Sequence, residues 1–592
     1  MPNLHGSLAE PPVDSLNAVT VTADKGVIIS RCDTINVNNS STISEILTHS
    51  TSLHIGDNGG FSGLKTVSLR GMGSAHTSIY IDGVRVSNLQ SGQNDLGMIG
   101  VENLRSATVD YAQNSVSFYT AHPSFDKYPV SGSARFLAGS FGTYLPSLRL
   151  GFRLSDKVSM SANAAGVFSK GNFGYGDGLF RENNNISQIR GGIDLFGKLN
   201  SGEFHVKAFC NAVERGVPGS TAFPSSDRQK DINAFTQGVL RKSFSSLYTL
   251  RLSAKGGYDD ILYESEWGDS RYGQTEFQLN SAHDFQITGW WKMSLAADLQ
   301  WDGLESTNYN ASRTTVISAA ASSFRTERFS ADIALEYNGA FDKGGLRRNV
   351  FLPSADARLH LSECLDITAF GRRAYRVPTF NELYYVGFGN PDLKPEDAIM
   401  TDIGLDFRRK ICSHWTLKAK VDGFFNLLTD KITSAPTAED PNKWLPYNIG
   451  KVRSSGADLH AGAEYDGKEV QWSFNVRYTF LSAVDRTSDS VTFGSQIPYI
   501  ARHSTVLDGK AEWKGWILKA TWQLRAGRTD SAGEMPDWNT TDMTVSKSLQ
   551  IKRVGEITFL LSAKNLADNR YEISGGYPMP GRSLTGGIEF KF

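Results

Sequence analysis

The sequence predicts a membrane all-β protein: an antiparallel transmembrane β-barrel of about 22 strands, with an N-terminal α/β plug domain in its lumen. Three features of the chain favour this fold. Gly is abundant, at 57 of 592 residues, or about 10 % where ~7 % is average. Long stretches alternate apolar and polar residues, which is the period of a β-strand. The alternation begins only after residues 123–129, so a separate domain precedes it.

Overall charge and hydropathy exclude several other classes of protein. The 61 Lys and Arg residues balance the 62 Asp and Glu residues to a net charge of −1, so no basic field is available to hold nucleic acid. No apolar stretch reaches the ~18 residues that a transmembrane helix requires. A helical globule is disfavoured as well, because each Gly in a helix costs about 1 kcal/mol relative to Ala.

The strands of the second domain have one apolar and one polar face. Apolar residues occupy every second position from Val470 to Phe480, and Trp516 to Leu524 repeats the pattern. These strands run to about ten residues and many end in Trp, as at Trp290 and Trp415, which is typical of a barrel whose apolar face meets lipid. Lipid tolerates no open sheet edge, so the sheet must close. Residues 130–592 provide 463 positions, enough for about 22 strands at roughly 20 residues per strand and connection.

The connections between strands are of two kinds. Residues 155–157 form a short turn, whereas residues 171–187, 216–232 and 383–398 are long and rich in Gly, Asn and Asp. We expect the long segments to be external loops and the short ones to lie on the periplasmic side.

We divide the chain into an N-terminal extension (1–17), a plug domain (18–125) and the barrel (130–592). Within the plug, Thr42 followed by Glu45 predicts the start of a short helix. Residues 64–69 and 78–86 are strand-like, and Asp82-Gly83 predicts a hairpin turn in the second of them. Arg70 is expected to be buried in an ion pair with Glu45 or Asp82.

Four stretches of the chain, in this order, resemble the TonB-dependent outer-membrane transporters of Gram-negative bacteria. Ser68 to Gly71 and Ile79 to Arg85 resemble the plug strand and hairpin of that family, and residues 376–396 resemble a barrel loop. Residues 565–592 resemble its closing strands. At the N-terminus, an extended segment resembles the Ton box, the peptide gripped by the energy-transducing protein TonB: Val19, Thr20, Val21, Thr22 and Ala23.

Within that family, the length and plug spacing are most similar to the vitamin B12 (cobalamin) receptors. The resemblance implies an energised import of a large, scarce ligand, with cobalamin ahead of a ferric siderophore or haem. It implies ligand contacts at two plug apices, Asn58, Gly59, Asn88, Ser91 and Gln93. Aromatic loop residues suit any of these large ligands, namely Tyr175, Tyr384 and Tyr385.

The same resemblance sets expectations for partners and location. It implies a multi-pass barrel in the cell outer membrane, in contact with lipid, TonB and a small-molecule ligand. It leaves open whether a surface lipoprotein caps the barrel. Cobalamin receptors use an Asp-rich calcium loop, but residues 174–178 hold too few carboxylates, so no cofactor is expected and the metal is unknown.

Several features keep other interpretations open. Asp110 to Phe125 lacks the glycines usual at this point of the plug, so the last plug strand is expected to be rearranged. This departure supports an alternative function, a plugged barrel that binds its ligand passively at the cell surface.

The sequence contains no nucleophile–base motif that would predict an enzyme. A disulfide between Cys364 and Cys412 stays open. Met1 to Leu16 lacks the apolar core of a signal peptide, which favours a start from which the signal has been removed.

Overall fold

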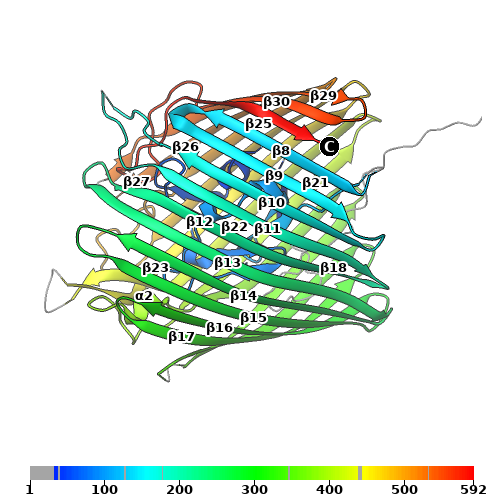
Figure 1. Ribbon diagram of the computed structural model, residues 1–592. Helices are drawn as coiled ribbons and strands as arrows, with labels where there is room; N and C mark the ends of the chain where they lie inside the picture. The colour runs from blue at the N-terminus through cyan, green and yellow to red at the C-terminus, as the bar shows by residue number, and fades with distance from the viewer. Residues whose placement is uncertain are drawn as a thin grey trace, which may run out of the picture.

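A computed structural model of the chain describes residues 32–37, 40–125, 128–176, 178–344, 347–437, 443–530 and 533–592. Its main body is a closed antiparallel barrel of 22 strands around a smaller N-terminal plug (Figure 1). This confirms the predicted fold class. The first half of the wall consists of β8 (Val130–Gly139), β9 (Thr143–Arg153), β10 (Val158–Ser169), β11 (Ile186–Leu199), β12 (Gly202–Gly219), β13 (Pro224–Ser245), β14 (Tyr248–Glu264), β15 (Ser270–Gln286), β16 (Trp291–Ser306), β17 (Asn310–Arg325) and β18 (Phe329–Asp342).

The second half of the wall returns to the first strand and closes the barrel. It consists of β19 (Arg347–Ser362), β20 (Leu365–Arg376), β21 (Glu396–Lys410), β22 (Trp415–Pro436), β23 (Trp444–Asp466), β24 (Val470–Asp485), β25 (His503–Trp513), β26 (Trp516–Ala526), β29 (Trp538–Ile551), β30 (Gly555–Lys564) and β31 (Ser583–Lys591). Pairing of β31 with β8 runs from Thr585 opposite Gly139 to Lys591 opposite Ser133. No strand edge is therefore left to lipid within the described wall.

The alternating pattern places apolar side chains outside and polar ones inside, as predicted. On β24, Phe474 and Phe480 are exposed at 46 % and 38 %, whereas Thr479 is 1 % exposed and faces the plug. The strands are longer than the expected ten residues, reaching 23 in β23. The reason is that several strands continue past the bilayer on the loop side, so their length exceeds what the membrane requires.

One end of the barrel has only short turns and the other has the long connections. Turns of two to four residues separate β9 from β10, β11 from β12 and each later pair at this end. Residues 170–185 and 377–395 form long loops at the opposite end, close to the predicted bounds, and the second contains α2 (Phe380–Tyr384). The prediction of a long loop at 216–232 is wrong. Strands β12 and β13 occupy most of this segment and leave only residues 220–223 as a turn, because their backbones keep pairing, for example Gly216 with Arg228.

The plug is a small α/β domain inside the barrel (Figure 1). Its elements are β1 (Cys32–Asn36), α1 (Ile43–Leu47), β2 (Leu53–Asp57), β3 (Lys65–Leu69), η1 (Ser74–His76), β4 (Ser78–Ile81), β5 (Val84–Val86), η2 (Leu96–Met98), η3 (Val101–Asn103), β6 (Leu104–Asp110) and β7 (Ser115–Thr120), and a further turn, η4 (Ser140–Gly142), follows β8. The five-stranded sheet has the order β1-β6-β7-β4-β5. The segment that lacks the usual glycines thus contributes β7, which pairs with β6 and β4 in the middle of the sheet.

The structure confirms the predicted helix start at Thr42 and the predicted hairpin turn at Asp82-Gly83 in the plug. The Thr42 side chain accepts a hydrogen bond from the Glu45 N–H at 3.2 Å and caps α1. Asp82 and Gly83 have φ values of 50° and 82°, which is the left-handed pair of a tight hairpin turn. Asp82 also accepts hydrogen bonds from the backbone and hydroxyl of Thr120, which fixes the hairpin to the end of β7.

The expected partners of Arg70 are wrong. Its guanidinium pairs with Asp402 of β21 and Asp458 of β23, each at 2.8 Å, and it stacks on Phe424. Arg70 directly follows β3, and its guanidinium lies 4.6 Å from the ring centre of plug residue Tyr111, where the carboxylates that reach it come from the barrel wall. Burial alone would lower the pKa of Arg70, but the two aspartates hold the pKa above its ordinary value. This cluster fastens the plug to the wall.

Cys210, Cys364 and Cys412 are free thiols, so the 364–412 disulfide is absent. Among the described residues, no helix is both long and apolar enough to cross a membrane.

Candidate functional site

A cavity of about 1030 Å³ lies between the plug and the wall formed by β10 to β15. We call it the apex cavity, because a plug loop at residues 88–95 projects into it. Loop residues Trp267, Asn308 and Tyr385 also line it, so it lies toward the end of the barrel that has the long connections. Its volume is at the upper end of ordinary ligand pockets, about 300 to 1,000 Å³.

The plug loop has a fixed shape. The Asn88 side-chain oxygen accepts a hydrogen bond from the Ser91 N–H at 3.1 Å, and the Asn88 carbonyl accepts one from the Gly92 N–H at 2.9 Å. A barrel loop supports it from outside, since the N–H of Phe380 in α2 donates to the Leu89 carbonyl at 2.8 Å. These hydrogen bonds fix the loop backbone, and the amide and hydroxyl side chains of the loop therefore point into the cavity from a rigid support.

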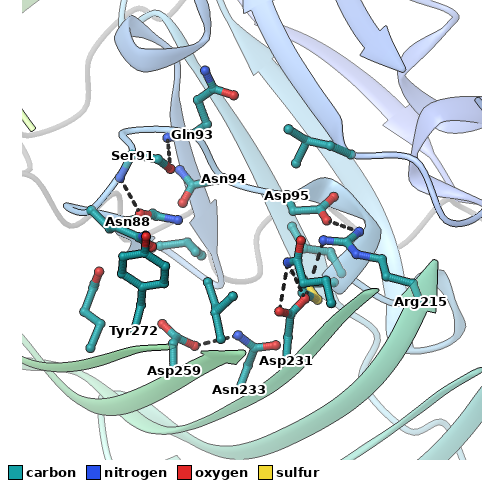
Figure 2. Close-up of a pocket in the computed structure, with 18 of the residues that line it drawn as sticks. Asn88, Ser91, Gln93, Asn94, Asp95, Arg215, Asp231, Asn233, Asp259 and Tyr272 are labelled. Atoms are coloured by element: carbon teal, nitrogen blue, oxygen red, sulfur yellow. Dashed lines mark hydrogen bonds and ion pairs between the residues drawn. The ribbon is translucent and has the colours of Figure 1, made fainter. Parts of the chain in front are cut away.

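The opposite face of the cavity belongs to the barrel. Figure 2 shows Asp231, Asn233, Asp259 and Tyr272 on the wall strands opposite the 88–95 loop. The Asn233 amide donates to Asp259 at 2.8 Å. Both residues belong to the lumen face of long strands, where polar side chains alternate with lipid-facing apolar ones.

Carboxylates outnumber cationic side chains around the apex cavity. The charged lining residues are Asp95, Glu102, Asp231, Asp259, Asp269 and Glu276 against Arg190, Lys207, Arg215 and Lys255. The cations are already paired: Arg215 lies 2.7 Å from Asp95, and Arg190 lies 2.6 Å from Glu102. Asp259 has no Lys, Arg or His within 4.0 Å among the described residues and is held by the neutral amide of Asn233. The cavity thus presents amides, hydroxyls and surplus negative charge.

Five of the eight predicted ligand residues line the apex cavity: Asn58, Asn88, Ser91, Gln93 and Tyr385. Gly59 lies behind the apex, where its N–H donates to Asp57 at 2.9 Å. Tyr175 is in the 170–185 loop, outside the lining of this cavity. Tyr384 also lies outside the lining and donates its hydroxyl to Asp342 at 2.6 Å. Burial, and then this hydrogen bond, raises the pKa of Tyr384, so it stays a neutral donor.

The structure describes only part of the other sites that the sequence predicts, namely the Ton box and the calcium loop. The Ton-box candidate, Val19 to Ala23, and Asp177 of the calcium candidate lie outside the described residues. One cluster in the described part of the chain gathers metal-ligand types, with oxygen and nitrogen atoms of Asp82, Asp194 and His205 within 4.8 Å of one another. The ammonium of Lys207, 2.6 Å from Asp194, already supplies the positive charge there.

The sequence alone did not indicate the wall residues Asp231, Asn233, Asp259 and Tyr272. Most lumen-facing positions of the barrel strands are polar, so the alternating pattern does not distinguish a polar position facing an open cavity from one packed on the plug. Only the position of the plug makes that distinction.

Comparison with known proteins identifies the family. The model of the TonB-dependent receptor plug domain matches residues 21–123, and that of the TonB-dependent receptor-like β-barrel matches residues 245–566. A vitamin B12 transporter, BtuB, of Photobacterium profundum is 22 % identical over 90 % of this chain and 87 % of its own. BtuB of Vibrio vulnificus is 24 % identical over 94 % and 90 %.

Solved structures share the fold. The copper transporter OprC has a TM-score of 0.78 at 15 % identity, over 98 % of this chain and all of its own. The FrpB iron transporter of Neisseria meningitidis has a TM-score of 0.77 at 13 % identity, over 95 % of this chain and 99 % of its own. A barrel model that matches more than half of the chain, a plug model and a closed 22-stranded wall agree: the chain belongs to the TonB-dependent receptors and is an outer-membrane β-barrel transporter.

Proposed function

We propose that this transporter imports cobalamin, which binds first in the apex cavity. The observation that carries the proposal is the chemistry of that cavity: a space of about 1030 Å³ lined by amide and hydroxyl side chains, with more carboxylates than cations. The named relatives, both vitamin B12 transporters, support the same ligand.

The lining favours a large neutral ligand over an anionic iron chelate. Cyanocobalamin has no net charge and carries amide groups around its ring, and amides are both donors and acceptors for Asn88, Gln93 and Asn233. A polyanionic ferric chelate would meet the surplus carboxylates at short range, where like charges repel. Haem is most often held by an axial His, and the described lining contains no His.

A binding titration of the purified protein tests the ligand. Cyanocobalamin is expected to bind with a Kd below about 1 µM, a free energy near −8 kcal/mol or better, and ferric siderophores or haem at least about 100-fold more weakly. Tight binding of a ferric siderophore with no binding of cyanocobalamin would instead assign the protein to iron uptake.

We further propose that Val19 to Ala23 is the Ton box. The segment is β-prone and close to the N-terminus, so a partner sheet can add it as an extra strand. Deleting residues 19–23 is expected to leave cyanocobalamin binding unchanged and to abolish its uptake by cells. Uptake equal to that of the intact protein would contradict this role, and binding without any energised uptake in the intact protein would favour the passive surface receptor.

A further inference from the structure

A second cavity, of about 420 Å³, lies on another side of the plug, against the wall formed by β25, β26 and β29 to β31. We call it the lateral cavity. It reaches from Ser40 and Glu45 near α1 to Gly60 and Phe173 at the loop end of the barrel. No Asn, Gln or charged residue of the 88–95 loop lines it, so it is separate from the apex cavity.

The charge of the lateral cavity is opposite to that of the apex cavity. Its charged lining residues are Lys65, Lys510, Lys519, Arg525, Arg528 and Lys564 against Glu45, Asp57, Asp508 and Asp542. Lys564 pairs with Glu45 at 3.1 Å, and Lys65 lies 3.7 Å from Asp57. Arg525 and Arg528 differ, because neither has a carboxylate within 4.0 Å among the described residues.

Both arginines donate their hydrogen bonds to backbone carbonyls, and the carboxylates of Asp537 and Glu572 act on Arg528 only from beyond 4.0 Å. Arg528 is 4 % exposed, and its terminal nitrogens donate to the carbonyls of Glu572, Ile573 and Pro536. Arg525 donates to the carbonyls of Thr505 and Leu524. A buried charge without a counter-charge is costly, and two of the same sign repel each other as well.

Unused hydrogen-bond donors lie in the same place. The guanidinium carbons of Arg525 and Arg528 are each 5.9 Å from the centre of the Trp538 ring, which places the three side chains together. The Trp538 indole N–H and the Arg528 Nε–H have no acceptor in the described structure. Buried donors normally find an acceptor, so these two donors, beside two arginines that have no carboxylate within 4.0 Å, favour a group that only accepts hydrogen bonds.

Nearby groups keep the local field positive. His54 of the plug lines the cavity, and burial, followed by the charges of Arg525 and Arg528, lowers its pKa to about 4, so it is neutral at pH 7. The remaining polar lining near Trp538 includes the hydroxyls of Tyr499 and Tyr571. Two carboxylates that line this cavity have hydrogen-bond partners other than the two arginines. Asp508 accepts a hydrogen bond from the Asn475 amide, and Asp542 accepts one from the Asn565 N–H.

We propose that the lateral cavity binds a phosphate-type oxyanion, held by Arg525, Arg528 and the indole N–H of Trp538. An oxyanion offers several acceptor oxygens and a negative charge, which are the two things the site lacks, and arginine binds it through paired N–H donors. The site is independent of the ligand proposed for the apex cavity. Its anion is either free phosphate or a phosphodiester carried by a larger ligand.

Thermal unfolding of the purified full chain, at constant ionic strength, tests the site. Inorganic phosphate replacing chloride is expected to raise the Tm of the wild type in a saturable way, since a ligand that binds only the folded state stabilises it. In the Arg525→Gln, Arg528→Gln double variant the shift is expected to disappear. Without phosphate, this variant is expected to be at least as stable as the wild type, because the unpaired buried charge of Arg528 and the like charge of half-buried Arg525 are gone.

Two further measurements make the test decisive. The Arg228→Gln variant, in which an exposed arginine paired with Glu214 is lost, is expected to keep the full phosphate effect. Calorimetric titration at 25 °C measures binding directly, with inorganic phosphate in one arm and dimethyl phosphate in the other. Binding of dimethyl phosphate as well assigns the site to a ligand-borne phosphodiester, whereas binding of inorganic phosphate alone assigns it to the free ion. Equal affinity of wild type and double variant for both probes, or no binding of either, would overturn the proposal.

Discussion

The apex cavity and the lateral cavity lie beside the same plug and are walled by the same kind of strand, yet their charges are opposite. Around the apex cavity four cations face six carboxylates and the arginines are paired, whereas around the lateral cavity six cations face four carboxylates and two arginines are unpaired. The difference supports our proposal that one barrel lumen holds two chemically distinct sites, one for a neutral amide-rich ligand and one for an anion.

The largest expected effect comes from releasing the plug, on which both cavities depend. Replacing Arg70 by Ala leaves Asp402 and Asp458 buried without their cation, at a cost of about 3 to 5 kcal/mol. We expect a large fall in unfolding temperature and the loss of ligand binding in both cavities. Replacing Arg228 by Ala removes an exposed pair, worth about 0 to 1 kcal/mol. Equal effects of the two substitutions would show that Arg70 does not fasten the plug.

The second prediction compares the two cavities by filling each of them in turn with a large side chain. Asn233→Trp places an indole in the apex cavity and is expected to weaken cyanocobalamin binding by about 100-fold or more, close to 3 kcal/mol. Thr521→Trp makes the matched change in the lateral cavity and should leave the Kd within about twofold. A titration of both variants measures this, and the reverse result would move the ligand to the lateral cavity.

The sequence predicts the fold of this protein better than it predicts the residues of the candidate site. The alternation along strands such as β24, the cap at Thr42 and the turn at Asp82-Gly83 are local signals, and local geometry satisfies them. The carboxylates that pair with Arg70 lie far from it in the sequence; Asp458, for example, is nearly 400 positions away. No local sequence pattern can therefore predict this pairing. The sequence does not predict the extended β12–β13 hairpin, because polar residues outside the bilayer follow the same pattern in a strand and in a loop.

The candidate site is predictable from the sequence on the plug and, among the barrel residues, at Tyr385. The 88–95 apex loop lies in a motif of recognisable spacing, and Asn88, Ser91 and Gln93 do line the apex cavity. Its wall partners, Asp231 and Asp259, share their pattern with every other lumen-facing residue. The unpaired arginines of the lateral cavity likewise cannot be distinguished in sequence from the paired ones, since pairing depends on which strands meet the plug.

The third prediction concerns the surplus negative charge of the apex cavity. Asp259→Asn removes one carboxylate while keeping its size and its contact with Asn233. Affinity for an anionic chelate such as ferric citrate is expected to rise about tenfold, near 1.4 kcal/mol, while that for neutral cyanocobalamin changes little. Competition titrations measure both ligands, and an unchanged ratio of the two affinities would show that charge does not select the ligand.

The smallest expected effect is a pH dependence that belongs to the lateral cavity. The pKa of His54 is lowered to about 4 from 6.5. Between these values the unfolded chain binds a proton that the folded chain does not, so stability is lost as the pH falls from 6.5 toward 4. Thermal unfolding at pH 7 and at pH 4.5 should show a smaller loss in His54→Gln than in the wild type. Identical losses would show that His54 keeps its ordinary pKa in the fold.

The central claim is that the apex cavity is the ligand site, and a structure of the protein with cyanocobalamin tests it most directly. The account predicts the ligand between the 88–95 loop and the wall residues Asp231, Asn233 and Asp259, with no change in the pairing of Arg70. Cyanocobalamin bound in the lateral cavity, or outside both cavities with the apex cavity empty, would contradict the account.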